Sequence, residues 1–330
     1  MADYIGHPFN TGFQYGTEST YGTEVATTTA IGKVRSWTPV LNNSIQESRG
    51  TGEGRNTGLA LWGVFDTGGS LVYEAHDFAF LKYFVGPMTG SGTSGTPYVL
   101  TESSIIDTGS AINFFSFEAG DEEATTDDVM TYVGCVGNDF NLAWAIGQPL
   151  IVTTNLVAKT LIASSTATAY TATSTPPWMF QQTSFKYGTT PSVVNKIQSM
   201  TISMSNNLFT YRDASRFISK PEPGLRNYAW TITAIVDQAQ KAAFELSFYG
   251  AATTPTTGVT SAEYTADEEL HMLFAEGTNA TQRQAEIKLD QCWITSLGKP
   301  VSLGSELTLL TVTGGAKSSL SNAFVTWWTN

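Results

Sequence analysis

Two stretches of the chain, VYEAHDFAFLKYFVG at residues 72–86 and VDQAQKAAFELSFYG at residues 236–250, repeat one pattern. Each follows apolar sequence, carries an acid near its start, and ends at a glycine that can adopt the left-handed conformation of a helix stop. Each is too apolar to stand in water alone. The pattern predicts two short helices that lie against a sheet, with anchors that coincide at an offset of 164: Phe80 with Phe244 and Phe84 with Phe248.

Other parts of the chain repeat in the same order. Residues 32–43, GKVRSWTPVLNN, resemble residues 195–207, NKIQSMTISMSNN, and the paired asparagines at their ends again align at an offset of 164. Behind the helices four residues recur at an offset of 157: Phe117 at Phe274, Gly120 at Gly277, Cys135 at Cys292 and Gly147 at Gly304. The fall from 164 to 157 places seven extra residues in the first copy, in the flexible sequence GSGTSGTP near residues 90–97.

The ordered repeats indicate a tandem duplication of one domain. A low-complexity Ser/Thr-rich segment with a double proline separates the copies. We therefore expect a first domain at residues 1–165, a linker at 166–177 and a second domain at 178–330.

The composition favours strands and turns over long exposed helices. Hydrophobic residues make up 41% of the 330 residues and charged residues only 14%, and Thr, Ser, Gly and aromatic residues are plentiful. Exposed helices need more Lys and Glu for their outer face. The net charge of −12 argues against a protein that grips nucleic-acid phosphates, although it does not argue against DNA that passes without being held.

Segments with alternating apolar and polar residues recur along both halves of the chain. We predict a mainly β fold of two tandem β-sandwich or barrel domains, each with one flanking α-helix. A strand is expected at 110–117. Other stretches are expected outside the strands: an extended arm at 1–29, long exposed loops at 42–58 and 208–224, a turn at 66–70, an acidic turn at 120–128 and a connection at 138–147.

The sequence contains no recognisable catalytic, cofactor-binding or metal-binding pattern, and we predict none of these sites. His7, His76 and His271 lie in no nucleophile, zinc-protease or phosphate-loop motif. The acidic runs lack the alternating ligands of a calcium loop, although a glycosidase-like carboxylate pair stays open. Cys135 and Cys292 are expected to be buried free thiols, because no metal-ligand spacing surrounds them.

The beginning of the chain lacks the basic and apolar segments of a signal peptide, and no apolar run approaches membrane-spanning length. We expect a soluble protein made in a cytoplasm, without membrane insertion. Two surface features have competing interpretations. The basic, aromatic loop from Arg212 to Lys220 suits nucleic acid, but contact with an acidic patch of a neighbouring subunit is favoured. Trp327 and Trp328 suit a sugar platform, but a core or interface anchor is favoured.

The order of elements resembles the tail tube proteins of long-tailed phages and archaeal tailed viruses. Three features carry the resemblance: a strand ending in paired asparagines before a long loop (GKVRSWTPVLNNSIQE and NKIQSMTISMSNNLFT), a strand leading into the helix, and closing strands (IGQPLIVTTNLVAK and LGSELTLLTVTGGAK). No single motif is diagnostic. The order of the elements, which covers most of both halves, carries the resemblance.

The resemblance implies a structural virion protein, in which strands of neighbouring subunits join around a channel for genome ejection. Six such domains usually form a ring, so three duplicated chains would suffice, with pseudo-sixfold symmetry. Six chains with one decorating domain each is the alternative. The protein would assemble in the host cytoplasm and reside in the virion tail. Implied partners are further copies of itself, tape measure, baseplate or tail tip, terminator and possibly sheath proteins, and double-stranded DNA passing through an acidic lumen without specific binding.

In such proteins the long loop after the first strand reaches the next ring, which maps here to residues 44–57 and 208–223. The residues expected at this inter-ring contact are Glu47, Arg49, Glu53, Arg55, Arg212, Asp213, Arg216 and Lys220. Two other functions stay open. A baseplate hub or distal tail protein also contains tube-type domains, and a tandem carbohydrate-binding module would be a monomer with exposed aromatic platforms.

Overall fold

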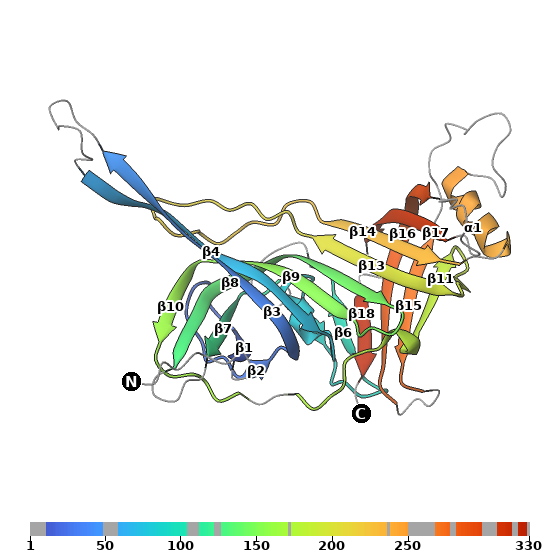
Figure 1. Ribbon diagram of the computed structural model, residues 1–330, viewed down its shortest axis with the longest axis horizontal. Helices are drawn as coiled ribbons and strands as arrows, with labels where there is room; N and C mark the ends of the chain where they lie inside the picture. The colour runs from blue at the N-terminus through green and yellow to red at the C-terminus, as the bar shows by residue number, and fades with distance from the viewer. Residues whose placement is uncertain are drawn as a thin grey trace, which may run out of the picture.

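The computed structural model describes residues 11–48, 59–103, 112–121, 127–170, 173–235, 238–249, 268–277, 282–298, 309–318 and 323–328. The described chain is mainly β, with antiparallel pairing between strands in every named pair and one α-helix, so the predicted fold class is confirmed. Figure 1 shows the strands of both halves side by side, with α1 at one end and a long hairpin projecting at the other.

The first half consists of two layers that share one long strand. The outer layer has the order β2-β1-β7-β8-β10. Its bounds are β1 Thr11–Thr17, β2 Thr29–Ala30, β7 Phe115–Asp121, β8 Asp128–Ala145 and β10 Thr160–Ser164. The inner layer has the order β3-β4-β9-β8, with β3 Lys33–Ser48, β4 Leu59–Glu74 and β9 Ile151–Ala158. Strand β8 passes from one layer to the other near Cys135, where its partner changes from β7 to β9.

The second half repeats this arrangement pair by pair. Its outer layer has the order β12-β11-β15-β16-β18 and its inner layer the order β13-β14-β17-β16. The bounds are β11 Thr183–Gly188, β12 Ser192–Val193, β13 Ile197–Ser205, β14 Asn227–Ala234, β15 Glu269–Ala275, β16 Gln284–Gly298, β17 Leu310–Ser318 and β18 Ala323–Trp328. Two short strands, β5 Met88–Thr89 and β6 Tyr98–Thr101, and a 3₁₀ turn, η3 Phe180–Gln182, complete the described elements.

The β-bulges recur as well, and they fix which residues are equivalent. The register shift between Val34 and Ser36 of β3 recurs between Ile197 and Ser199 of β13. A second shift follows Gly137 in β8 and Ile294 in β16. Bulges are specific local features, so their recurrence extends the duplication to individual residues.

The bulges correct the alignment that the sequence indicated. Because Ser36 and Ser199 both follow the bulge, Asn43 is equivalent to Asn206, which is one position away from the predicted pairing. Tyr132 of β8 and Leu289 of β16 are equivalent at the offset of 157. Tyr132 lies opposite Phe117, and Leu289 lies opposite Leu270, so Phe117 is equivalent to Leu270. The predicted pairs Phe117 with Phe274 and Gly120 with Gly277 are therefore wrong by four residues. A slide of four keeps the same side chains on the same face of a strand, so the hydrophobic pattern cannot detect it.

The two predicted helices turn out differently. In the second half α1, Gln238–Tyr249, is an α-helix as expected. In the first half only a 3₁₀ turn forms, η2 at Ala79–Tyr83. The prediction of an α-helix at residues 72–86 is therefore wrong. Its aromatic residues are buried on every side, whereas an amphipathic α-helix keeps one face in water. The anchors still correspond, because Phe80 packs on Tyr15 with ring centroids 5.1 Å apart and Phe244 on Tyr187 at 5.4 Å.

Several predicted loops are strands. Strand β4 runs without a turn through 66–70, β8 runs through 138–145, and β3 extends to Ser48, so that β3 and β4 form the projecting hairpin of Figure 1. The expected arm contains β1, which pairs with β7, and the strand predicted at 110–117 begins at Phe115. Gly68 and Gly69 suggested a turn, but both lie inside β4, where a Cβ would collide with neighbouring backbone oxygens.

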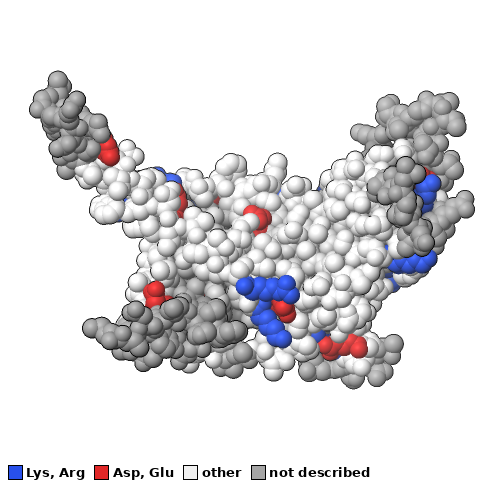
Figure 2. Space-filling view, in the orientation of Figure 1, with Lys and Arg blue, Asp and Glu red and all other residues white. Residues whose placement is uncertain are grey.

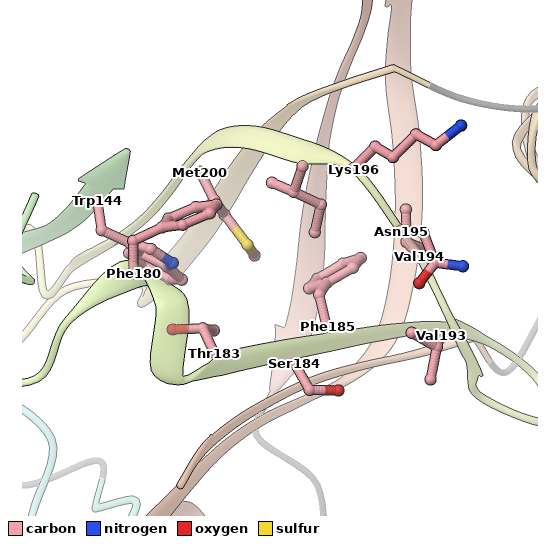
Figure 3. A pocket seen from close by; sticks show the side chains of 11 residues that line it. Trp144, Phe180, Thr183, Ser184, Phe185, Val193, Val194, Asn195, Lys196 and Met200 are labelled. Atoms are coloured by element: carbon pink, nitrogen blue, oxygen red, sulfur yellow. The ribbon is translucent and has the colours of Figure 1, made fainter. Parts of the chain in front are cut away.

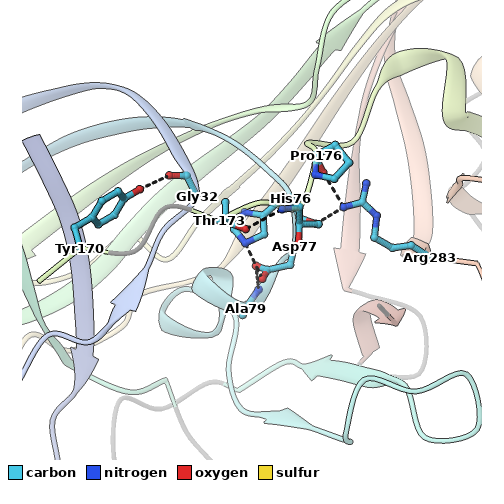
Figure 4. Close-up of polar contacts among 9 residues, drawn as sticks. Gly32, His76, Asp77, Ala79, Tyr170, Thr173, Pro176 and Arg283 are labelled. Atoms are coloured by element: carbon cyan, nitrogen blue, oxygen red, sulfur yellow. Dashed lines mark hydrogen bonds and ion pairs between the residues drawn. The ribbon is translucent and has the colours of Figure 1, made fainter. Parts of the chain in front are cut away.

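The two halves are joined edge to edge. Strand β8 of the first half pairs with β13 of the second, which creates one sheet with the order β3-β4-β9-β8-β13-β14-β17-β16. In the outer layer β6 pairs with β18. Near the linker, Arg283 donates hydrogen bonds to the carbonyls of His76 (3.3 Å) and Pro176 (2.7 Å), and its guanidinium lies 4.0 Å from the Trp178 ring (Figure 4). The linker thus contacts both halves, and Tyr170 also donates to the Gly32 carbonyl.

Candidate functional site

The junction between the halves is a complete example of how two of these domains join. Its ladder runs from Ser199 opposite Ala145 to Ser205 opposite Asp139. Beneath the ladder the side chains that point into the core are buried on both sides, with Met204 1% exposed and Phe140 1% exposed. The pairing therefore continues both the backbone hydrogen bonds and the hydrophobic core across the junction.

One asparagine fastens this junction. The Asn206 side chain, which is 1% exposed, donates through Nδ2 to the carbonyls of Phe84 (2.8 Å) and Gly137 (3.1 Å). Its Oδ1 accepts a hydrogen bond from Arg226 Nε at 3.1 Å. Arg226 also reaches the carbonyls of Val85 (3.0 Å) and Ser103 (2.6 Å). The second half thus supplies donors for carbonyls at the end of η2, which a short 3₁₀ turn leaves without internal partners.

A cavity of about 330 Å³ lies beside the same junction, where Trp144 of β8 meets Phe185 and Met200 of the second half (Figure 3). Its lining is mostly apolar, and Figure 3 shows the Lys196 side chain extending away from the aromatic rings. It is a packing gap at the seam between the halves.

The equivalent of β13 in the first half, β3, is an open edge. Val40 is 51% exposed and Leu41 47% exposed, whereas Met204, which is equivalent to Leu41, is 1% exposed. A hollow of about 250 Å³ opens beneath β3 and includes Trp37, Pro39 and Tyr132 in its lining. The far edge of the eight-stranded sheet is β16, where no described strand pairs with Ser296, Leu297 and Gly298 on the side away from β17.

The face of this sheet that points away from the core, called the open face below, is rich in hydroxyl groups. On the second half one of its positions carries an ionisable side chain, Lys317 at the end of β17. The other positions carry none: Trp293, Ser296, Gly298, Ser199, Thr201, Ser203, Ser205, Asn227, Ala229, Thr231, Thr233, Thr311, Thr313 and Gly315. Two threonine pairs bridge neighbouring strands, Thr231 with Thr313 and Thr233 with Thr311, each at 3.4 Å between hydroxyl oxygens.

On the first half the open face carries few charges. The acids at the positions of β4 and β8 that point away from the core are Asp66, Glu74 and Asp139. Glu74 is paired with Arg35 at 2.9 Å and Asp66 with Arg212. In Figure 2, which shows one side of the molecule, the charged side chains are few and scattered over a largely uncharged surface. The acidic lining that the resemblance implied is thus not concentrated on the described strands of this sheet.

The predicted basic loop contacts its own chain. Arg212 pairs with Asp66, Arg216 donates to Asn43 Oδ1, and the carbonyl of Arg216 accepts from Phe65 N at 2.9 Å. The Arg216 guanidinium also lies 5.5 Å from the Trp62 ring. The acidic partner of Arg212 therefore lies on the β3–β4 hairpin of the same chain, where we had favoured a neighbouring subunit.

The other predicted contact residues are only partly placed. Glu47 is exposed on the hairpin, Asp213 bonds with Ser219 (3.2 Å) inside the loop, and Lys220 is half-buried. Arg49, Glu53 and Arg55 lie outside the described residues. The sequence drew attention to the paired asparagines, but it did not single out Asn206 or Asn43, because their roles depend on contacts with residues far away in the chain.

The cysteines, His271 and Trp327 are the remaining candidates that the sequence raised. Cys135 and Cys292 are buried free thiols, as predicted, and burial raises the pKa of both. His271 lies between Glu269 (2.7 Å) and Glu286 (3.0 Å), but in the described part of the chain no three His, Cys, Asp or Glu side chains are grouped to hold a metal ion. Trp327 is 1% exposed and packs on Phe78, as expected of a core anchor. None of the described helices has the length and apolar character that a membrane crossing requires.

Comparison with known families accounts for this architecture. The model of a family described as phage tail tube protein matches residues 8–281, which is more than half of the chain and includes parts of both halves. No curated protein sequence matches the chain. This is a structural family rather than an enzyme family, and its members are components of the virion tail. The duplicated antiparallel fold, the edge-to-edge junction and the family match agree, and the chain belongs to the phage tail tube protein family.

Proposed function

We propose that the chain is the major subunit of a tail tube, and that three copies close into a ring through the pairing of β16 with β3 of the next copy. The observation that supports this proposal is the junction of β8 with β13 inside one chain. Strands β16 and β3 are the equivalents of those two strands, and both are open at the ends of the eight-stranded sheet.

The bulges supply the register of this pairing. Ser205 faces Asp139 inside the chain, so Asn42 faces Ser296 of the next copy. By the same rule Leu41 faces Leu297 and Val40 faces Gly298. The neighbouring copy then covers the apolar edge of β3 and the hollow beneath it. Burial of apolar surface, at roughly 25 cal/mol per Å², drives the association.

The sheet order favours three chains over six. Both halves contribute four strands to the same sheet and both present the same open face. An arrangement in which one half only decorates the ring would leave the β8–β13 ladder without a role. Three chains therefore provide six equivalent domains and alternate two kinds of junction, one within a chain and one between chains.

The open face becomes the wall of the channel. Its serine and threonine hydroxyls bond with water and with one another. Cations that would hold phosphates are few on its described strands: Lys33, Arg35, which is paired with Glu74, and Lys317. Double-stranded DNA therefore passes a hydrated, nearly uncharged wall during ejection. This replaces like-charge repulsion, which we had expected, as the main reason for weak contact with DNA.

The β3–β4 hairpin and the 208–223 loop that lies on it form the contact with the next ring. The hairpin projects from the body in Figure 1 and exposes Ile45 (58%), Leu61 (51%) and Trp62 (68%). Exposed apolar residues of this kind mark a protein interface. Stacked rings would cover these side chains, and the tail proteins at the two ends of the tube would cover them at its termini.

Cysteine cross-linking tests the ring. Directly opposed residues of antiparallel strands have Cα atoms about 4.5–5.5 Å apart, within the range of a disulfide. A chain with Asn42→Cys and Ser296→Cys should form covalent dimers and closed trimers on oxidation, with threefold rings in electron micrographs. The native cysteines are buried and do not interfere. The matched control, Asn42→Cys with Asn227→Cys, places the second cysteine away from the sheet edge and should not cross-link. Closed hexamers, or monomers at every concentration, would contradict the proposed ring.

A further inference from the structure

Asn206 has an equivalent in the first half that does not make the corresponding contact. Asn206 is the residue by which one domain fastens the backbone of the preceding domain, and its equivalent in the first half is Asn43. Asn43 is exposed, at the open edge of the sheet, and its Nδ2 has no hydrogen-bond acceptor among the described residues. The groups that Asn206 binds are the carbonyls of Phe84 and Gly137. The bulge makes Ile294 the equivalent of Gly137, and the sequence offset of 164 aligns Phe248 with Phe84.

We infer that Asn43 is the residue that locks one chain to the next, by donating its side-chain amide to the carbonyls of Phe248 and Ile294 of a second copy. This inference rests on the proposed β16–β3 pairing and names the specific contact within it. The partner is a second copy of this chain, because the equivalent contact is already made at the equivalent junction, between β8 and β13, inside the chain.

The acceptors suit this role for a physical reason. Phe248 lies in the last turn of α1, and the last four carbonyls of an α-helix have no partner within the helix. Ile294 precedes the bulge of β16, where the ladder is interrupted. Backbone carbonyls that become buried on assembly need donors, since an unsatisfied buried polar group costs about 1–3 kcal/mol. A single amide group can satisfy two such carbonyls, as Asn206 does.

The amide of Asn43 is held in a comparable way. Arg226 donates to Asn206 Oδ1, and Arg216 donates to Asn43 Oδ1. In both cases an arginine of the second half donates a hydrogen bond to the side-chain oxygen of the asparagine. The Nδ2 hydrogens are then left to donate to carbonyls of another domain. Arg216 therefore acts as a positioning residue for Asn43, although it comes from the 208–223 loop and not from the next strand.

The test compares assembly of three variants of the full chain. Asn43→Ala removes the donor, and Asn43→Asp keeps the shape while replacing the donor with an acceptor. Asn227→Ala is the matched control, because Asn227 is an exposed asparagine of β14 on the open face, away from the edge of the sheet. Sedimentation over a concentration series should show that both Asn43 variants need at least about tenfold more protein than wild type for half-assembly, which corresponds to about 1.4 kcal/mol. The Asn227 control should assemble like wild type, and all variants should unfold at the wild-type temperature as monomers.

The cross-linking pair separates the two proposals. If both Asn43 variants assemble at the wild-type concentration while Asn42→Cys with Ser296→Cys still forms closed trimers, the role of Asn43 is wrong and the ring stands. If the cysteine pair does not cross-link at all, the strand pairing itself is wrong. Reduced assembly of Asn227→Ala equal to that of Asn43→Ala would also overturn the inference, because the effect would then not be specific to the edge of the sheet.

Discussion

Strands β3 and β13 occupy equivalent positions in the two halves, with the same bulge and the same place at the edge of a four-stranded layer, yet they differ in surroundings. Strand β13 is covered by β8, and its inward residues Met200, Ile202 and Met204 are buried. No strand in the described part of the chain covers the outer edge of β3, and Leu41 is 47% exposed. Of these two equivalent edges, β13 is paired within the chain and β3 is exposed on its surface.

The sequences of the two strands reflect this difference. Where β13 has Ile202, β3 has Pro39, which lacks a backbone N–H and so removes one possible ladder bond. Proline on an exposed strand limits indiscriminate pairing with other sheets. In the proposed ring, the edge that pairs between chains thus offers one backbone donor fewer than the edge that pairs within the chain.

The largest expected effect comes from truncating equivalent apolar residues of the two strands. Met204→Ala leaves a cavity in a closed core and should reduce the free energy of unfolding by about 2–5 kcal/mol. Leu41→Ala at the exposed edge should change it by less than about 0.5 kcal/mol in the monomer, but should weaken assembly. Urea denaturation of both monomeric variants checks this. Equal destabilisation would mean that β3 is already covered in the monomer.

The second effect concerns the asparagine of the closed junction. Asn206→Ala removes the donor to the carbonyls of Phe84 and Gly137 and leaves Arg226 Nε without its acceptor, in a buried site. We expect a loss of about 1–3 kcal/mol of unfolding free energy, seen without any assembly. Asn43→Ala is the control in the same experiment and should be silent in the monomer. Thermal unfolding at low protein concentration provides the measurement, and an unchanged midpoint for Asn206→Ala would remove the basis for treating it as a fastener.

The third effect is a pH dependence confined to the first half. The Glu18 side chain is 1% exposed, and burial raises the pKa of its carboxyl above the ordinary 4.5, although hydrogen bonds from Gly134 and Ser116 oppose the shift. The folded state therefore binds this proton more tightly than the unfolded state, so the contribution to stability decreases as the pH rises from 4.5 through the raised pKa.

Replacing this carboxyl isolates its contribution. The Glu18→Gln variant should show a flatter dependence of the unfolding midpoint on pH above 4.5 than wild type. Glu47→Gln, on the exposed hairpin, is the matched control and should leave the wild-type slope unchanged. The same slope in Glu18→Gln and wild type would assign the pH dependence to other groups.

The smallest effect concerns the ion pair between the hairpin and the loop. The side chains of Arg212 and Asp66 are 22% and 40% exposed, so water and salt screen their attraction. Asp66→Asn should cost about 0–1 kcal/mol of stability, and the difference from wild type should vanish at high salt. Urea denaturation at low ionic strength and in about 0.5 M NaCl measures this. A larger, salt-independent loss would indicate that the pair organises the hairpin.

The sequence by itself determined the duplication, the mainly β fold, the buried cysteines and the tube-type family, because these depend on local periodicity and on repeated order. It also determined α1, whose pattern and position give an α-helix. The same pattern failed at η2, because aromatic packing on all sides overrode local helical preference.

Only the tertiary structure decided the register, the partners of Arg212 and Arg216, and the different surroundings of Asn206 and Asn43. A period-two pattern fixes which face a residue occupies but not which residue lies opposite, so the slide of four positions was invisible in the sequence. The slide of one position was resolved by the bulges of β3 and β13, which fix the equivalent residues. Exposure of an edge is likewise a property of what pairs with it. The two copies became different because one edge met its partner within the chain and the other did not.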